Sequence, residues 1–224
     1  MESAQERVHG SNLGGVPIYL VHYTSKLPDA QIWESFPFVE LKDVVTGESP
    51  ALQTSVRLCW SNYALHLQFR CEDDVIVSPY TRRDDPLYDA DVVEWFIEPQ
   101  QQEEQRYYEF NISPHNVLFD SLITYEEGKP KHFQPEWNAE GITTQVRYLE
   151  RNPVTNKVVV EYTATLPFSD VNVIPPHPGD EWKLNLFRID EDEAGERSYS
   201  AWSPTGAVQF HRPERFGTIR FYKG

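Results

Sequence analysis

Apolar and polar side chains alternate along much of this chain with the period of two that a β-strand produces. The alternating segments are rich in Val, Ile, Tyr, Phe and Trp, and the connectors hold most of the 17 prolines and 11 glycines. No long window has helical periodicity, so many short strands predict an all-β fold, an antiparallel β-sandwich of two packed sheets. The predicted strands are residues 16–21, 55–60, 65–72, 91–98, 107–113, 117–120, 142–149, 157–166, 181–189, 198–202 and 218–222. Short helical turns are expected at residues 29–35 and 168–171.

The length of 224 residues suits one domain of this class, and the sequence contains no internal repeat and no low-complexity linker. Hydrophobic residues make up 39% of the chain, which is enough for a substantial core. We expect residues 1–26 to be an N-terminal extension that packs along the sandwich, and residues 27–224 to form the domain itself.

Cys59 and Cys71 lie in a predicted hairpin made of the segments SVRLCW and LHLQFRC. The four-residue turn between them would pair Trp60 with Leu65, which places Cys71 on the apolar face and Cys59 on the opposite face. The two cysteines would lie roughly 16 Å apart along the strands, and a disulfide needs Cα atoms within about 7 Å. We therefore expect two free thiols, which are typical of a reducing compartment.

The stretch DDPLYDADVVEWFIEP at residues 84–99 is the most informative part of the chain. An acidic loop with one aromatic residue, Tyr88, leads into a strand on which Glu94 shares a face with Val92 and Phe96. A carboxylate between apolar neighbours loses hydration, and it stays charged only where a donor or a ligand meets it. An aromatic ring near such a carboxylate indicates a sugar site, because the ring covers C–H groups and the carboxylate accepts from hydroxyls. The alternative is a structural carboxylate bonded to a neighbouring strand or arginine.

The segment YYEFNIS at residues 107–113 would add a polar strip beside Glu94, because Glu109 and Asn111 share a face with Tyr107. Such a strip is a plausible floor for a sugar site. A solvated outer face of an antiparallel sheet is the equally simple interpretation.

Near the C-terminus, Trp202 ends a predicted strand, and the loop SPTGAVQ then leads to Phe210. Phe210 follows a flexible loop and could close over a bound ring. The neighbouring His211 is expected to be structural rather than catalytic, since no zinc or nucleophile motif accompanies it.

Charge narrows the class of partner. With 20 basic and 35 acidic residues, the net charge of −15 argues against nucleic acid and against an anionic membrane surface. It is compatible with neutral sugars, with hard cations, or with a role in solubility alone. Acidic clusters at residues 72–74, 84–91 and 190–193 make calcium possible as a cofactor, although no EF-hand spacing is present and a solvated charged loop is the favoured interpretation of each.

The apolar segment at residues 16–21 is too short for a signal-peptide core or a membrane span. We expect a cytoplasmic protein if the chain is complete, and a secreted one if a signal peptide has been removed.

Over residues 27–222 the chain resembles a family 9 carbohydrate-binding module of the type attached to xylanases. The resemblance rests on an early Asp-x-x-x-Trp element at Asp29 and Trp33, the hairpin VRLCWSNYALHLQFRCED, the strands DADVVEWFIEP, YYEFNIS and GDEWKLNLFR, and the run WSPTG followed by FHRPERFG. It implies a jelly-roll β-sandwich related to the DOMON domains. It also implies non-catalytic binding of mono- or oligosaccharides, with bound calcium in some members.

The same resemblance implies roles for individual residues. Two tryptophans sandwich the sugar in xylanase modules, and their positions fall on Tyr88 and Phe210 here. The carboxylate that bonds sugar hydroxyls falls on Glu94, a sugar-binding arginine falls on Asn111, and a loop asparagine falls on Ala207. The candidate ligand-binding residues are Tyr88, Glu94, Glu109, Asn111, Trp202 and Phe210.

Three other functions stay open. Glu94 and Glu109 on neighbouring strands could be the carboxyl pair of a glycoside-acting enzyme. A haem-carrying role, as in some DOMON relatives, is disfavoured because Met1 is the only methionine. A purely structural or protein-binding sandwich is the third, and the oligomeric state is left open.

Overall fold

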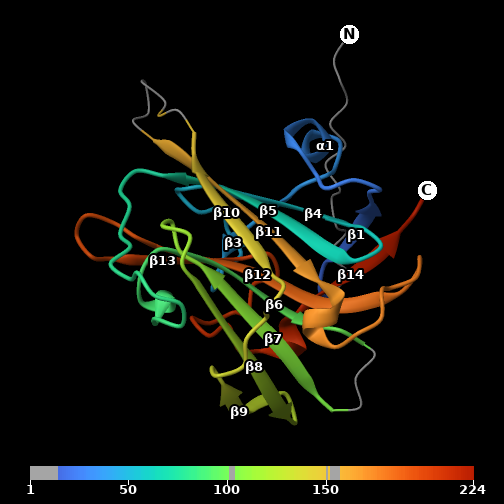
Figure 1. The fold of residues 1–224 in the computed structure, drawn as a ribbon. Coiled ribbons are helices and arrows are strands. Elements are labelled where there is room, and N and C mark those ends of the chain that lie inside the picture. Colours follow the sequence, from blue (N-terminus) through green and yellow to red (C-terminus); the bar gives the residue numbers. More distant parts are fainter. Residues whose placement is uncertain (1–14, 101–103, 150, 152–156) are drawn as a thin grey trace.

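The computed structural model describes residues 15–100, 104–149, 151 and 157–224. These residues form a single sheet of 14 strands (Figure 1). The strands are β1 (Ile18–Tyr23), β2 (Val39–Glu40), β3 (Lys42–Asp43), β4 (Thr54–Trp60), β5 (Ala64–Asp73), β6 (Val92–Glu98), β7 (Arg106–Ile112), β8 (Leu118–Glu126), β9 (Lys129–Gln134), β10 (Thr143–Tyr148), β11 (Val158–Pro167), β12 (Glu181–Glu191), β13 (Arg197–Ala201) and β14 (Gly217–Tyr222). The helical elements are α1 (Ala30–Glu34), η1 (Leu87–Asp89), η2 (Phe168–Val171) and η3 (Pro213–Arg215).

Each predicted strand is present at or near its predicted bounds, and the two predicted helical turns are present as α1 and η2. The prediction missed β2, β3 and β9 and ended β8 too early. The strands β2 and β3 have two residues each, too few for a pattern. β9 has the sequence KPKHFQ, whose proline and lysines are typical of the sheet edge that it forms.

The sheet curls back on itself, so that its two halves form the layers of a sandwich (Figure 1). One half contains β10, β11, β5 and β4, and the other runs through β14, β12, β6, β7, β8 and β9. Between them lies β1, which pairs in parallel with both β14 and β4. The predicted sandwich is confirmed, but uniformly antiparallel pairing is corrected at β1. No hairpin fixes its direction, because a long connection containing α1 follows it.

The strand β1 falls within the segment 1–26 that the sequence predicts to be an extension. Its residues from Ile18 to His22 pair with Thr218 to Tyr222, so this part of the segment is integrated in the sheet. Residues 1–14 lie outside the described residues. The division of the chain at residues 26 and 27 stays a prediction.

The main core lies between the two layers and is built from every second residue of the strands that face each other. Leu58 and Leu67 from β4 and β5 share this core with Trp95 and Phe110 from β6 and β7, and all four are fully buried. The rings of Phe69 and Trp95, whose centroids are 6.4 Å apart, connect the two layers directly. Period-two alternation therefore selects the inner face as predicted.

Trp202 is a member of this core, and its predicted contact with a ligand stays a prediction. Its side chain is buried, and it approaches Gly217 so closely that a Cβ there would lie 2.4 Å from Trp202 Cζ3. An aromatic residue at the end of a strand can turn to either face. Here the absence of a side chain at Gly217 makes room for the indole ring.

The predicted hairpin register is confirmed, with Trp60 opposite Leu65 and Leu58 opposite Leu67. Cys59 and Cys71 are both free and buried, as predicted, and only Cys71 belongs to the main core. The longest α-helix described is α1 with five residues, and none in the described ranges has the length and hydrophobicity needed to cross a membrane.

A second apolar cluster covers the outer face of β12, β6, β7 and β8. Val92 and Phe96 of β6 belong to it, whereas the intervening residues of that strand face the main core. Phe210 and Phe216, which follow β13 in the chain, pack over this outer face. The segment after β13 therefore forms a partial third layer, so β6 is buried on both sides.

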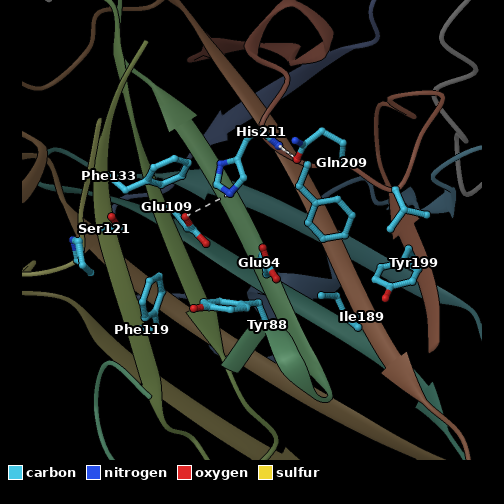
Figure 2. Close-up of a pocket in the computed structure, with 13 residues that line it drawn as sticks. Tyr88, Glu94, Glu109, Phe119, Ser121, Phe133, Ile189, Tyr199, Gln209 and His211 are labelled. Atoms are coloured by element: carbon cyan, nitrogen blue, oxygen red, sulfur yellow. Dashed lines mark hydrogen bonds and ion pairs between the residues drawn. The ribbon is translucent and has the colours of Figure 1, made fainter. Parts of the chain in front are cut away.

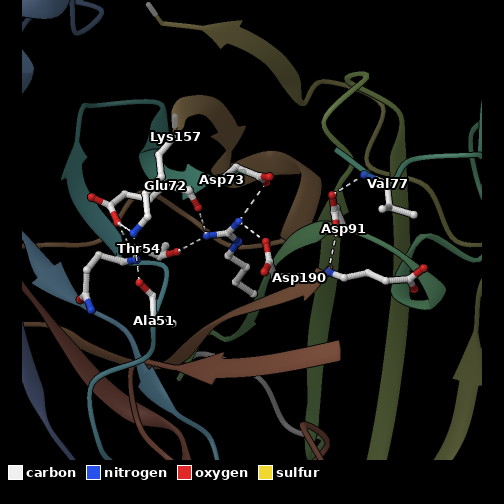
Figure 3. A network of polar contacts seen from close by, with 11 residues as sticks. Ala51, Thr54, Glu72, Asp73, Val77, Asp91, Lys157 and Asp190 are labelled. Atoms are coloured by element: carbon white, nitrogen blue, oxygen red, sulfur yellow. Dashed lines mark hydrogen bonds and ion pairs between the residues drawn. The ribbon is translucent and has the colours of Figure 1, made fainter. Parts of the chain in front are cut away.

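A buried ionic network joins the two layers at the end of the sandwich (Figure 3). Its centre is Arg188 on β12, which donates to Asp73 on β5 at 3.0 Å, to the backbone oxygen of Glu72 at 2.6 Å, and to Asp190. Burial raises the pKa of Asp73 to about 7, and the charge of Arg188 opposes this shift. Burial likewise raises the pKa of Asp190.

We expect Arg188→Met to lower the free energy of unfolding by about 3–5 kcal/mol near pH 8, because it leaves two buried carboxylates without their counter-charge. The loss should shrink as the pH falls towards 5. An aspartate whose folded pKa lies above its unfolded pKa stabilises the folded state on protonation, and removing Arg188 raises the folded pKa further. Urea unfolding at both pH values measures this difference.

The matched control is Arg220→Met, which removes an exposed arginine paired with Glu181. Its cost should stay below about 1 kcal/mol and should vary little with pH. A cost for Arg188→Met that is equally small, or independent of pH, would contradict the stabilising role assigned to the network.

Candidate functional site

A pocket of about 520 Å³ opens on the outer face of the second layer, above β6, β7 and β8 (Figure 2). Glu94 lies at its centre, with Phe119 and Ser121 on one side and Ile189 and Tyr199 on the other (Figure 2). The remaining wall comes from η1, from β9 and from the segment after β13. The lining residues are Tyr88, Glu94, Glu109, Phe119, Ser121, Phe133, Pro135, Ile189, Tyr199, Val208, Gln209, Phe210 and His211.

Strand register brings the two glutamates of the floor together. Glu94 on β6 pairs with Asn111 on β7, and Phe96 pairs with Glu109, so the glutamates are diagonal neighbours on one face. Both are almost completely buried, with 1% and 4% of their surfaces exposed. The sequence-based expectation that they share a strip of the sheet is confirmed.

Burial raises the pKa of both carboxyls, and the nearby Glu109 raises the pKa of Glu94 further. Asn111 Nδ2 donates to Glu109 Oε1 at 3.0 Å and opposes the shift of that group. Glu94 Oε1 is buried and has no hydrogen-bond partner among the described residues. Since two negative charges repel strongly in a site with little water, the pair holds a proton at pH values where exposed glutamates have lost theirs.

His211 contributes a neutral polar edge to the pocket. Burial lowers its pKa to about 4, so the imidazole carries no charge near neutral pH. Its Nδ1 lies 2.8 Å from the Tyr107 hydroxyl, and its Nε2 lies 4.0 Å from Glu109 Oε2. When Tyr107 donates to Nδ1, the proton on Nε2 faces Glu109. Stacking on Phe96, with ring centroids 4.9 Å apart, fixes this orientation.

Aromatic rings form much of the wall. Tyr88 is 45% exposed and meets the ring of Phe119 edge-on at 5.7 Å. Phe210 is 8% exposed, because it stacks flat on Phe187 with centroids 4.1 Å apart. Tyr88, Glu94 and Phe210 therefore line one pocket although they are distant in the sequence. Tyr88 offers more free ring surface than Phe210 does.

Two positions that the resemblance placed at the site do not line the pocket. Asn111 is fully buried beneath it, where it donates to Glu109. This contact supports Glu109, and the predicted role of Asn111 as a direct ligand contact stays a prediction. Ala207 accepts a hydrogen bond from Thr205 through its backbone oxygen and is absent from the lining.

Sequence reasoning missed several residues of the wall. Phe119 and Ser121 alternate on β8 in the same way as the floor residues on β7, so extending that strand pattern would have found them. Phe133 lies on the edge strand that was not predicted. Gln209 follows from no pattern, because its place depends on the path of the loop before Phe210.

Acids of the predicted calcium-binding clusters already contact other groups of the protein. Asp91 accepts from the backbone amides of Val77 and Glu191 at 2.6 and 2.8 Å, and Asp190 contacts Arg188. Across the described ranges, no group of three or more His, Cys, Asp or Glu side chains is arranged to hold a metal ion. Calcium therefore has no identified ligand set among these residues.

Comparisons with known proteins agree with the fold. A fungal protein from Arthroderma benhamiae, described as an extracellular protein, is 25% identical over 195 residues, which cover 82% of this chain and 85% of that protein. A solved structure from Bacteroides uniformis has a TM-score of 0.70 at 18% identity and covers 91% of this chain and 98% of its own.

A family 9 carbohydrate-binding module from Caldicellulosiruptor kristjanssonii, in complex with cellotriose, has a TM-score of 0.66 at 16% identity and covers 92% of this chain and 94% of its own. The same organism's module in complex with glucose has a TM-score of 0.64 at 16% identity, with coverage of 92% and 96%. The family model described as carbohydrate family 9 binding domain-like matches residues 27–223. The chain, with its curled sandwich and its pocket over two buried glutamates, belongs to this family.

Proposed function

We propose that this protein is a non-catalytic carbohydrate-binding module whose pocket holds a sugar ring above Glu94. In this proposal Tyr88 covers the C–H face of the ring, Phe210 forms the opposite wall, and Glu94 accepts hydrogen bonds from hydroxyl groups. The observation that carries the proposal is Glu94 itself, a carboxyl 1% exposed whose Oε1 has no partner among the described residues and which lines an aromatic pocket. A buried acceptor left open in this way is costly unless a ligand satisfies it.

The composition of the wall supports the same proposal. Apolar rings alternate with single polar groups, as sites for small polar ligands require. Ser121 Oγ is also buried without a hydrogen-bond partner, so a second group is available to a hydroxyl. The family 9 modules in complex with glucose and cellotriose make these sugars the first ligands to test. The extracellular description of the fungal relative favours the secreted alternative over a cytoplasmic location.

The alternative of a glycoside-acting enzyme keeps one supporting observation, which is that Glu94 and Glu109 line the same pocket with raised pKa values. A general acid requires such a shift. Incubation with a panel of aryl glycosides and oligosaccharides decides between the two functions. Turnover that Glu94→Gln abolishes would replace the binding-module proposal, whereas binding without turnover supports it.

We expect Tyr88→Ala to weaken binding of glucose or cellotriose about 2- to 10-fold, because the variant removes the most exposed aromatic surface of the pocket. Isothermal titration calorimetry measures the change. Tyr63→Ala is the matched control, since Tyr63 is 53% exposed and lies outside the pocket. Equal affinities of the two variants for the sugar would show that Tyr88 makes no contact with it.

We expect Glu94→Gln to weaken sugar binding roughly 10- to 100-fold, since the amide nitrogen of glutamine cannot accept a hydrogen bond as a carboxyl oxygen does. The same variant should gain stability relative to the wild type as the pH rises from 5 to 8. A glutamate with a raised folded pKa destabilises the folded state when it ionises, and glutamine does not ionise. Thermal unfolding of the variant and the wild type at the two pH values measures this difference in stability. A folded variant that binds sugars as the wild type does would remove Glu94 from the site.

A further inference from the structure

The pocket combines two buried acids with an uncharged and largely aromatic wall. None of the described lining residues is a lysine or an arginine. The one basic side chain, His211, is kept neutral by burial. Acids that serve only the fold are normally met by a cation, as Arg188 meets Asp73 and Asp190 on the inner face of the same part of β12. The glutamates of the pocket have no such partner.

We infer that the pocket is selective for a cationic sugar, a hexosamine with a free amino group, whose ammonium lies between Glu94 and Glu109. This inference rests on the proposed function, because the same pocket and the same aromatic wall hold the sugar ring. It adds that Glu109 has a role of its own, namely recognition of a positive charge.

The environment of the two glutamates supports an organic cation over a metal ion. A metal ion would need more ligands than two carboxyls supply, and no group of three or more suitable side chains exists in the described part of the chain. An ammonium requires fewer contacts, because three N–H donors suffice and aromatic faces stabilise its charge. Five aromatic rings besides His211 line the pocket: Tyr88, Phe119, Phe133, Tyr199 and Phe210.

Cations outside the pocket are engaged elsewhere. Arg212, next to His211, donates to the backbone oxygen of Thr205 and to Glu214. Lys183 on β12 donates to Thr218 and lies near Glu98, a third acid of this face that accepts from Tyr125 at 2.6 Å. Neither basic residue lines the pocket. A ligand is therefore the group that would supply positive charge to Glu94 and Glu109.

The other titratable groups that line the pocket are phenols. Tyr88, with Asp89 and Tyr80 nearby, faces it from the loop before β6, and Tyr199 faces it from β13. Tyr107 lies on β7 beside Glu109 and bonds His211. None of these groups is positive at neutral pH. Arg197 on β13, which bonds Tyr199, is paired with Asp89 and Glu191 and does not line the pocket. The residues that line the pocket therefore supply no positive charge to the pair.

Calorimetry with three sugars tests the inference without any variant. Glucosamine should bind at least about tenfold more tightly than glucose and N-acetylglucosamine at pH 6.5, because only its amino group is charged. N-acetylglucosamine has its nitrogen at the same carbon as glucosamine but carries no charge. Comparing these two sugars therefore separates the effect of the charge from the effect of a substituent at that position. Affinity for glucosamine should rise with pH as the pair ionises, until the amine itself loses its proton.

Proton release gives an independent readout. A cation that binds a pair still holding a proton displaces part of it, so the observed enthalpy for glucosamine should differ between phosphate and Tris buffers in proportion to the protons released. The enthalpy for glucose should be the same in both buffers. An enthalpy for glucosamine that does not depend on the buffer, together with an affinity no higher than that of glucose, would overturn the inference.

Variants assign the effect to Glu109. Glu109→Gln should remove most of the preference for glucosamine over glucose, measured as the ratio of the two affinities within the variant, whereas Glu98→Gln, a carboxyl on β6 outside the pocket, should leave that ratio unchanged. If glucose binds and the amino group adds nothing, only the inference falls. If glucose, cellotriose and glucosamine all fail to bind the folded protein, the proposed function falls with it.

Discussion

The strand β6 is buried on both faces, and the rest of the molecule is arranged around this constraint. Its inward residues, Val93, Trp95 and Ile97, complete the core between the layers. Its outward residues, Val92 and Phe96, would be exposed on an ordinary sandwich, but the segment after β13 covers them. Glu94 lies between these two residues, so the same covering that completes the apolar cluster removes water from its carboxyl. The acid and its pocket are thus consequences of a partial third layer.

The partial third layer also explains why the acidic residues of this protein have different environments. Several acids lie at exposed positions, where they bond backbone amides, as Asp29 and Asp192 do. Asp73 and Asp190 are buried but share Arg188, so their charges contribute to the fold. Glu94 and Glu109 are buried to a similar degree, but only neutral groups, the Asn111 amide and the His211 imidazole, meet Glu109, and Glu94 Oε1 has no partner among the described residues. A protein that keeps two acids in such a place retains a destabilising feature, which is typical of a site kept for a ligand.

Much of the fold could be predicted from the sequence, because alternation in a strand fixes which residues face inward once one face is apolar. The segments that became β4, β5, β6, β7 and β12 follow this rule, and so does the hairpin register around Cys59 and Cys71. Alternation did not predict the place of Trp202, because the room for its indole ring comes from Gly217, a residue without a side chain in a distant strand. Nor did it predict the parallel direction of β1, because alternation is identical for parallel and antiparallel neighbours.

The candidate site was predictable in its floor and less so in its walls. Tyr88, Glu94 and Glu109 follow from the strand and the loop that precedes it, and Phe210 followed from the family resemblance. The remaining walls depend on tertiary placement: Phe133 lies on an irregular edge strand, and Gln209 lies in a loop whose path no local pattern specifies. Strand periodicity predicts the face of the sheet on which Asn111 lies. It does not predict that the amide of Asn111 is buried and donates to Glu109.

The parallel pairing of β1 with β14 has a mechanical consequence. Ile18 lies beside Thr218 and His22 beside Tyr222, so the chain enters at one end of this strand pair and leaves at the other. Tension applied to the domain through both ends would pull the two strands past each other along their length. All the inter-strand hydrogen bonds of the pair would then bear the load together, whereas strands pulled from the same end separate one bond at a time. A module tethered between two larger bodies would resist stretching through this geometry.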